Sequence, residues 1–100
     1  MTTDEKTPQA PPSKEALDAV HSFPCRYDIK AFGENDDIFL LEITALVTEM
    51  VPDGSGEVTP RISGKGRYLC ATIGFHAQHA NHVQSLYIEL QRIDGLRMLL

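Results

Sequence analysis

Three histidines recur at intervals of three residues, at His76, His79 and His82, and imidazole nitrogens are common ligands of zinc and nickel. His79 and His82 fall at the start of an expected helix, whereas His76 ends an expected strand, so we do not expect the three rings to converge. No cysteine or carboxylate lies close in sequence to complete a set of four ligands. We therefore favour solvated histidines over a metal site, and we predict no cofactor.

Two cysteines, Cys25 and Cys70, fall on strands that are expected to be neighbours, an arrangement that would suit a redox pair. Strand alternation, however, places Cys25 on the core face and Cys70 on the opposite face. Side chains on opposite faces of a sheet cannot reach disulfide geometry. Neither cysteine has a Cys-x-x-Cys partner or an obvious base nearby in sequence. We interpret both as small apolar residues that fill space.

The chain has 100 residues, 42% of them apolar, and a formal net charge of −5. Such a chain forms one small domain, and small domains often gain stability by pairing. The acidic balance argues against a general binder of nucleic acids or anionic membranes, because either function would need a strong positive field. No apolar run approaches the roughly 18 residues of a membrane span, and no signal-peptide pattern opens the chain. We therefore expect a cytoplasmic protein.

The elements that must position these residues follow from apolar periodicity and from turn residues. Strands are expected at about 25–32, 58–62, 68–75 and 96–100, and helices at about 37–51 and 80–92. Pro60 cannot donate to a ladder, so its strand belongs at a sheet edge. The order strand, helix, strand, strand, helix, strand predicts an α+β ferredoxin-like fold. Its antiparallel sheet has the order 4-1-3-2, with both helices on one face.

The chain is expected to consist of an N-terminal tail and one domain. Residues 1–13 hold three prolines among polar residues and are expected to be a disordered tail, and residues 14–100 form the single domain. A short helix over residues 13–21 is expected to have Ser13 as its N-cap and to end before Pro24. Leu17 and Val20 should contact the body of the domain.

The apolar stripes of the two main helices define the expected core. They consist of Phe39, Ile43, Leu46, Val47 and Met50 in the first helix and of Val83, Leu86, Tyr87 and Leu90 in the second. An acidic turn with Glu34, Asp36 and Asp37 precedes the first of these helices. A helix N-terminus attracts anions, but three carboxylates would repel them, so we interpret this turn as a helix cap.

The sheet face without helices is the most informative surface. Its expected outward residues are Arg26, Asp28, Lys30 and Phe32 on the first strand, Thr59 and Arg61 on the second, Tyr68, Cys70 and Thr72 on the third, and Arg97 and Leu99 on the fourth. Phe32 and Tyr68 are expected side by side, and stacked aromatic residues on two central strands are typical of RNA-recognition sheets. The RNP sequences of such sheets are missing, and the chain is acidic. A half-apolar face with charges is more often a protein-binding surface.

Several segments resemble a known family. They are Phe23-Pro24, Lys65-Gly66 with Tyr68, Val83 to Tyr87 with Glu89-Leu90, Ile93-Asp94 and Arg97-Met98. Over about residues 16–100 the chain resembles the YbeD-like family of small bacterial proteins of unknown function. The resemblance implies a ferredoxin-like domain similar to the ACT-type regulatory domains, which bind small molecules between paired sheets. It brings no catalytic residues, and the chain departs from the family in its longer Pro-rich N-terminus and its acidic loop.

These observations favour a non-enzymatic regulatory or adaptor domain, since no nucleophile with a base, paired-carboxylate site or phosphate loop stands out. The predicted interaction surface consists of Arg26, Lys30, Phe32, Arg61, Tyr68, Thr72 and Arg97. Its expected occupant is a second copy or another protein, with a small ligand at the joint as a further option. An RNA-binding module that uses the same face is the alternative hypothesis.

Overall fold

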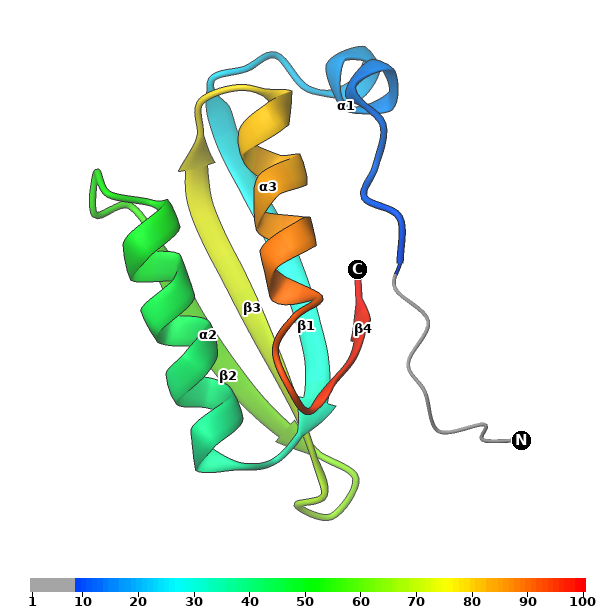
Figure 1. Cartoon of the computed structure of the whole chain (residues 1–100), viewed down its shortest axis with the longest axis vertical. Helices are drawn as coiled ribbons and strands as arrows, with labels where there is room; N and C mark the ends of the chain where they lie inside the picture. The colour runs from blue at the N-terminus through cyan, green and yellow to red at the C-terminus, as the bar shows by residue number, and fades with distance from the viewer. Residues whose placement is uncertain (1–8) are drawn as a thin grey trace.

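The computed structural model describes residues 9–100, in which a four-stranded antiparallel sheet carries two long helices on one face (Figure 1). The elements are α1 (Lys14–Val20), β1 (Cys25–Glu34), α2 (Asp37–Met50), β2 (Glu57–Ser63), β3 (Tyr68–Ala77), α3 (Ala80–Leu90) and β4 (Leu96–Leu99). The strand order is β2-β3-β1-β4. The predicted ferredoxin-like plan is therefore confirmed, including the edge position of the strand that contains Pro60.

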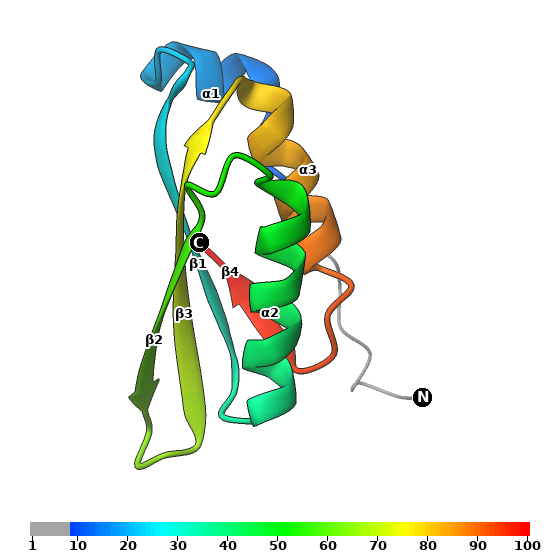
Figure 2. The same cartoon turned by 90° about the vertical axis from the view of Figure 1, so that its left-hand side faces the viewer.

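The core lies between the sheet and the two long helices, on the side seen to the right of the strands in Figure 2. Both predicted helical stripes face it: Phe39, Ile43 and Val47 of α2 and Val83, Leu86, Tyr87 and Leu90 of α3 are buried. They pack against the inward residues of the two central strands, which are Ile29, Ala31, Leu69, Ala71, Ile73 and Phe75. Burial of this apolar surface is the main contribution to stability.

The start of α2 is defined by a local hydrogen bond. Asp36 is the N-cap of α2, and its side chain accepts a hydrogen bond of 2.9 Å from the amide of Ile38. The acidic turn therefore does cap the helix. Glu34, by contrast, is not part of that cap, because β1 extends to this residue and its carboxylate pairs with Arg97.

The short helix α1 begins and ends close to the prediction. The Ser13 hydroxyl accepts a hydrogen bond of 3.1 Å from the amide of Ala16, so Ser13 is the N-cap. Leu17 is buried against the domain, but Val20 is 78% exposed, so the predicted contact of Val20 is wrong. The helix has only seven residues and ends at Val20, and Leu17 is its one buried residue. Its buried face is therefore too short to include Val20.

Part of the predicted N-terminal tail lies against the domain. Residues 1–8 of that tail are outside the described part of the chain. The segment 9–13 runs beside α3 and β4 (Figure 1), and the Gln84 side chain donates a hydrogen bond of 3.0 Å to the carbonyl of Pro12. The Gln9 side chain contacts the backbone of Leu99 in β4.

Candidate interaction surface

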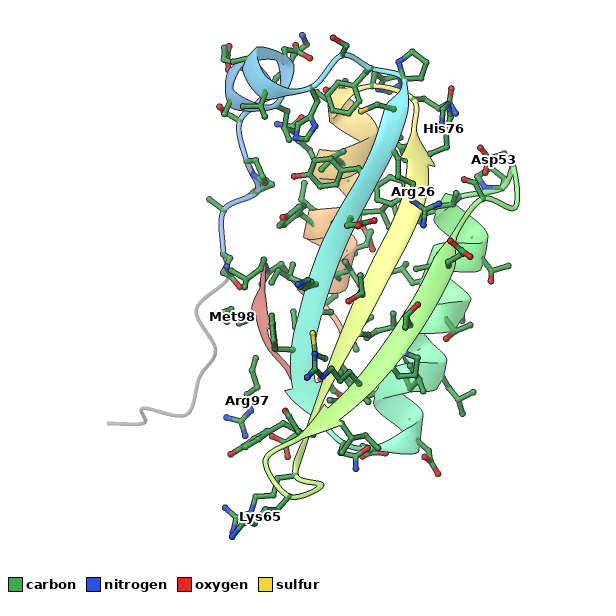
Figure 3. The ribbon with its side chains drawn as sticks, turned by 180° about the vertical axis from the view of Figure 1, so that it is seen from behind. Arg26, Asp53, Lys65, His76, Arg97 and Met98 are labelled. Atoms are coloured by element: carbon green, nitrogen blue, oxygen red, sulfur yellow. The ribbon has the colours of Figure 1, made fainter. Side chains whose placement is uncertain are left out.

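The sheet face opposite α2 and α3 is open, and Figure 3 looks directly onto it. The strand register determines which side chains meet there, because residues directly opposite each other share a face. All seven residues of the predicted interaction surface lie on or beside this face: Arg26, Lys30 and Phe32 on β1, Arg61 on β2, Tyr68 and Thr72 on β3, and Arg97 on β4.

One cross-strand row contains most of the apolar surface. Arg61 of β2 lies opposite Cys70 of β3, Cys70 lies opposite Phe32 of β1, and Phe32 lies opposite Met98 of β4. Met98 is 41% exposed, and Phe32 and Cys70 are partly exposed. Three adjacent apolar side chains with an arginine at one end therefore cross the face at a single level.

The neighbouring row is more polar. Thr59, Thr72 and Lys30 lie opposite one another, and the backbone of Lys30 exchanges hydrogen bonds of 2.9 and 2.8 Å with Leu100. Within residues 9–100, neither Lys30 nor the exposed Arg61 forms an ion pair with a carboxylate. These two side chains are therefore available cations beside the apolar row.

The other two cations of the predicted surface are already paired. Arg26 donates a hydrogen bond of 2.7 Å to Glu57 and lies 3.7 Å from Asp28. The pKa of Arg26 is raised, mainly because of the hydrogen bond to Glu57. Arg97 donates to the carboxylate of Glu34 at 2.9 Å, and the Glu34 hydrogen bond is the main reason that the pKa of Arg97 is raised. A partner would have to compete with these carboxylates.

Two details of the face differ from the prediction. Tyr68 lies opposite Glu34 and therefore diagonally from Phe32, and the described residues include no ring contact between the two aromatic side chains. The prediction that Leu99 points outward is wrong, since Leu99 is 2% exposed. The register shifts between Phe32 and Gly33, and this irregularity places Met98 rather than Leu99 on the open face.

Met98 is thus the apolar residue of the face that sequence reasoning missed. Strict alternation from Arg97 assigns residue 98 to the core, and only the paired strand reveals the extra residue. A strand of four residues offers too short a pattern for the irregularity to appear in the sequence.

The three histidines do not converge. His82 lies between the helices: its Nε2 is 2.9 Å from the carbonyl oxygen of Met50, and its Nδ1 accepts a hydrogen bond of 3.3 Å from the amide of Gln78. Nε2 must therefore carry the proton and donate to Met50. His76 and His79 are exposed at the end of β3 and the N-cap of α3. Across residues 9–100, no three His, Cys, Asp or Glu side chains lie close enough to hold a metal ion.

The cysteines lie as expected. Cys25 opposes Ala77 at one end of β1, whereas Cys70 opposes Phe32 near the other end, and both thiols are free. Cys70 belongs to the open face and contributes to its apolar row.

A groove of about 350 Å³ lies on the opposite side of the molecule, between α2 and α3. Its lining residues are Glu42, Ala45, Leu46, Glu49, Glu89, Arg92 and Ile93. Three carboxylates and one guanidinium give this side an acidic character, in contrast to the available cations of the open face.

The sheet order and the helices on one face define a small ferredoxin-like α+β protein with an open, partly apolar sheet surface. Residues 18–100 match a family model described as "Protein of unknown function (DUF493)". The chain therefore belongs to this family, which is the YbeD-like family that its sequence resembles.

Bacterial relatives support the same assignment over most of the chain. The chain is similar to a UPF0250 protein of Pasteurella multocida, with 35% identity over 80 residues that are 78% of this chain and 88% of the relative. A UPF0250 protein of Pectobacterium carotovorum is 38% identical over 90 residues, which are 87% of this chain and 99% of the relative. Neither name states an activity. No helix within residues 9–100 is long and apolar enough to cross a membrane.

Proposed function

We propose that this chain is a non-enzymatic adaptor or regulatory domain that binds an acidic, partly apolar protein surface on its open sheet face. The observation that carries the proposal is the row Arg61, Cys70, Phe32 and Met98, with Lys30 in the next row. A half-apolar patch with cations that lack a carboxylate partner is suited to a partner with exposed apolar groups and carboxylates.

The charge distribution supports a partner of this kind. The chain has a net charge of −5, yet the open face contains Lys30 and Arg61, which form no ion pair with any carboxylate of residues 9–100. The groove behind it is lined by Glu42, Glu49 and Glu89. An acidic partner is therefore repelled by the helix side and attracted by the sheet side.

Several observations favour binding over catalysis. The Cys25 and Cys70 thiols lie on opposite faces of the sheet, and His82 uses both ring nitrogens in hydrogen bonds to the backbone. We do not narrow the proposal to ACT-type sensing of amino acids, because Asp36 and Asp37 place carboxylates at the N-terminus of α2, where a carboxylate ligand would be repelled.

The test compares two double charge reversals. Lys30→Glu with Arg61→Glu reverses the two cations beside the apolar row, whereas Lys65→Glu with Arg67→Glu makes the same change of charge in the exposed β2–β3 turn. Proteins retained by each purified variant from a lysate of the native cell are quantified by mass spectrometry. The binding of each retained protein is then measured directly with purified components.

A true partner should bind the face variant at least about tenfold more weakly than the wild type and should bind the turn variant normally. Equal affinity for both variants would exclude this surface. The same variants decide the RNA alternative: tight, salt-sensitive binding of single-stranded RNA that is lost only in the face variant would replace the proposal with an RNA-binding function.

A further inference from the structure

The outer edge of β4 is occupied by a side chain of the same molecule. The side-chain Nε2 of Gln9 donates a hydrogen bond of 3.0 Å to the carbonyl oxygen of Leu99, and the side-chain Oε1 of Gln9 accepts one of 2.6 Å from the backbone amide of Leu99. In Figure 1 the N-terminal segment descends from α1 beside β4, and Figure 3 shows the same proximity from behind. Through one of its N–H groups and its oxygen, the side-chain amide takes the place of a peptide group from a neighbouring strand.

The register explains why Leu99 presents both groups outward. Lys30 and Leu100 exchange hydrogen bonds in both directions across the β1–β4 pair. Bonded and non-bonded pairs alternate in an antiparallel ladder, so the adjacent pair of Ala31 and Leu99 is non-bonded. The peptide groups of Leu99 therefore point away from β1, toward whatever lies at the edge of the sheet.

The two edges of the sheet differ in their capacity to accept another strand. β2 contains Pro60, which lacks an amide donor and protects an edge strand from further pairing. β4 contains no proline, and its one charged residue, Arg97, is paired with Glu34, so the segment from Met98 to Leu100 is uncharged. Within residues 9–100, the two outward groups of Leu99 are covered by Gln9 alone. An uncharged apolar edge is one that readily accepts another strand.

The cover lies outside the part of the chain that the family model matches. The family match begins at residue 18, so β4 lies inside the region shared with relatives and Gln9 lies outside it. The Pectobacterium carotovorum relative is 99% covered by the match, although the match includes only 87% of this chain. Gln9 therefore lies in a part of the chain that the family model does not include.

We propose that the β4 edge is a strand-addition site for β4 of a second copy of this chain, and that Gln9 is a removable cover that limits this pairing. This proposal concerns the edge of the sheet and does not rest on the function proposed above. A two-fold axis at Leu99 would pair Leu99 with Leu99 of the second copy through the two groups that Gln9 now holds. It would also bring together Met98 and Leu100, which are 41% and 60% exposed, across an uncharged seam.

The test measures self-association of the full chain by sedimentation. Gln9→Ala removes the cover, and Gln78→Ala removes an exposed amide side chain far from β4 as the matched control. In the wild type, each protomer must break the hydrogen bonds of its own Gln9 cover before it can dimerise. Hydrogen bonds of ordinary net strength weaken the dimerisation constant about fivefold for each protomer. Because a dimer contains two protomers, we expect Gln9→Ala to dimerise about 30-fold more tightly. The control should associate like the wild type.

A second substitution locates the seam. Adding Met98→Lys to Gln9→Ala places like charges across the two-fold axis and should restore the monomer. Hydrogen exchange of the Leu99 amide should slow as the concentration of Gln9→Ala rises. The proposal is overturned if Gln9→Ala stays monomeric up to about 1 mM, or if Met98→Lys leaves its dimer intact. Lys30→Glu with Arg61→Glu should not alter this dimer, so failure here is distinguishable from failure of the open-face proposal.

Discussion

Gly33 lies where a side chain has no room, and replacing it with alanine should destabilise the fold. An added Cβ would lie 2.5 Å from the carbonyl oxygen of Gly95 and 2.5 Å from Cζ of Phe39. Phe39 is 2% exposed, and the Gly95 contact is backbone, so neither neighbour can withdraw cheaply. Overpacking costs about 1–3 kcal/mol, and two contacts of 2.5 Å with neighbours that cannot move place this site at the upper end, about 3 kcal/mol. Alanine recovers about 0.5–1 kcal/mol of strand propensity relative to glycine. We expect a net loss of about 2 kcal/mol in the free energy of unfolding.

Gly74→Ala is the matched control in the adjacent strand. Its Cβ would overlap the guanidinium of Arg26 and lie 2.8 Å from Oδ1 of Asp28, but these side chains are 54% and 60% exposed and can move aside. The weakened surface ion pairs cost about 0–1 kcal/mol, which the gain in strand propensity offsets.

Urea unfolding followed by circular dichroism measures both variants. A loss of about 2 kcal/mol lowers the midpoint for Gly33→Ala by about 1–2 M, whereas Gly74→Ala should stay within about 0.5 M of the wild type. Equal midpoints for Gly33→Ala and the wild type would refute the reasoning, because they would mean that the β1 bulge and Phe39 relax without cost.

Further predictions concern a buried phenol, a bridging histidine and a helix cap. Burial, with a smaller effect of Tyr27, raises the pKa of Tyr87 from 10.0 to about 12. The folded state therefore holds this proton more strongly, so its stabilising effect is complete below pH 10 and is lost as the pH rises toward 12. Allowing for partial solvation, the free energy of unfolding of the wild type should fall by about 1–2 kcal/mol more than that of Tyr87→Phe between pH 10 and pH 12, as measured by urea unfolding. Equal decreases in the two proteins would contradict the raised pKa. His82→Ala leaves the Met50 carbonyl without its donor and should cost about 2 kcal/mol, whereas the exposed His79→Ala should cost less than about 0.5 kcal/mol in the same assay. Equal effects of the two histidine substitutions would refute the bridging role. Asp36→Ala should lower the thermal midpoint through loss of about 1 kcal/mol, and Asp36→Asn should retain most of the cap; a larger loss for asparagine would contradict the capping role.

The fold could be predicted because local patterns and tertiary burial agree. Val83, Leu86 and Leu90 repeat at helical spacing and are buried, and Pro60 restricts its strand to an edge wherever the rest of the sheet lies. The alternation of β1 likewise assigned Lys30 and Phe32 to one face.

What could not be predicted depends on contacts between distant segments. The register shift beside Phe32 arises from the pairing of β1 with β4, so the exposure of Met98 and the burial of Leu99 have no local signal. The hydrogen bond of His82 to Met50 joins residues 32 positions apart. The contact of Gln9 with Leu99 spans 90 positions, and a glutamine in a Pro-rich polar segment looks like any other tail residue.

The separation of charge between the two sides of the molecule has a kinetic consequence. Carboxylates line the groove between α2 and α3, while Lys30 and Arg61 lie on the other side of the sheet, so these charges of the described residues form a dipole across the sheet. In the field of an acidic neighbour such a dipole experiences a torque that turns the sheet side forward before any surfaces touch. Ions shorten the reach of that field to about 8 Å at physiological strength, so salt would slow productive encounters more than it would hasten dissociation.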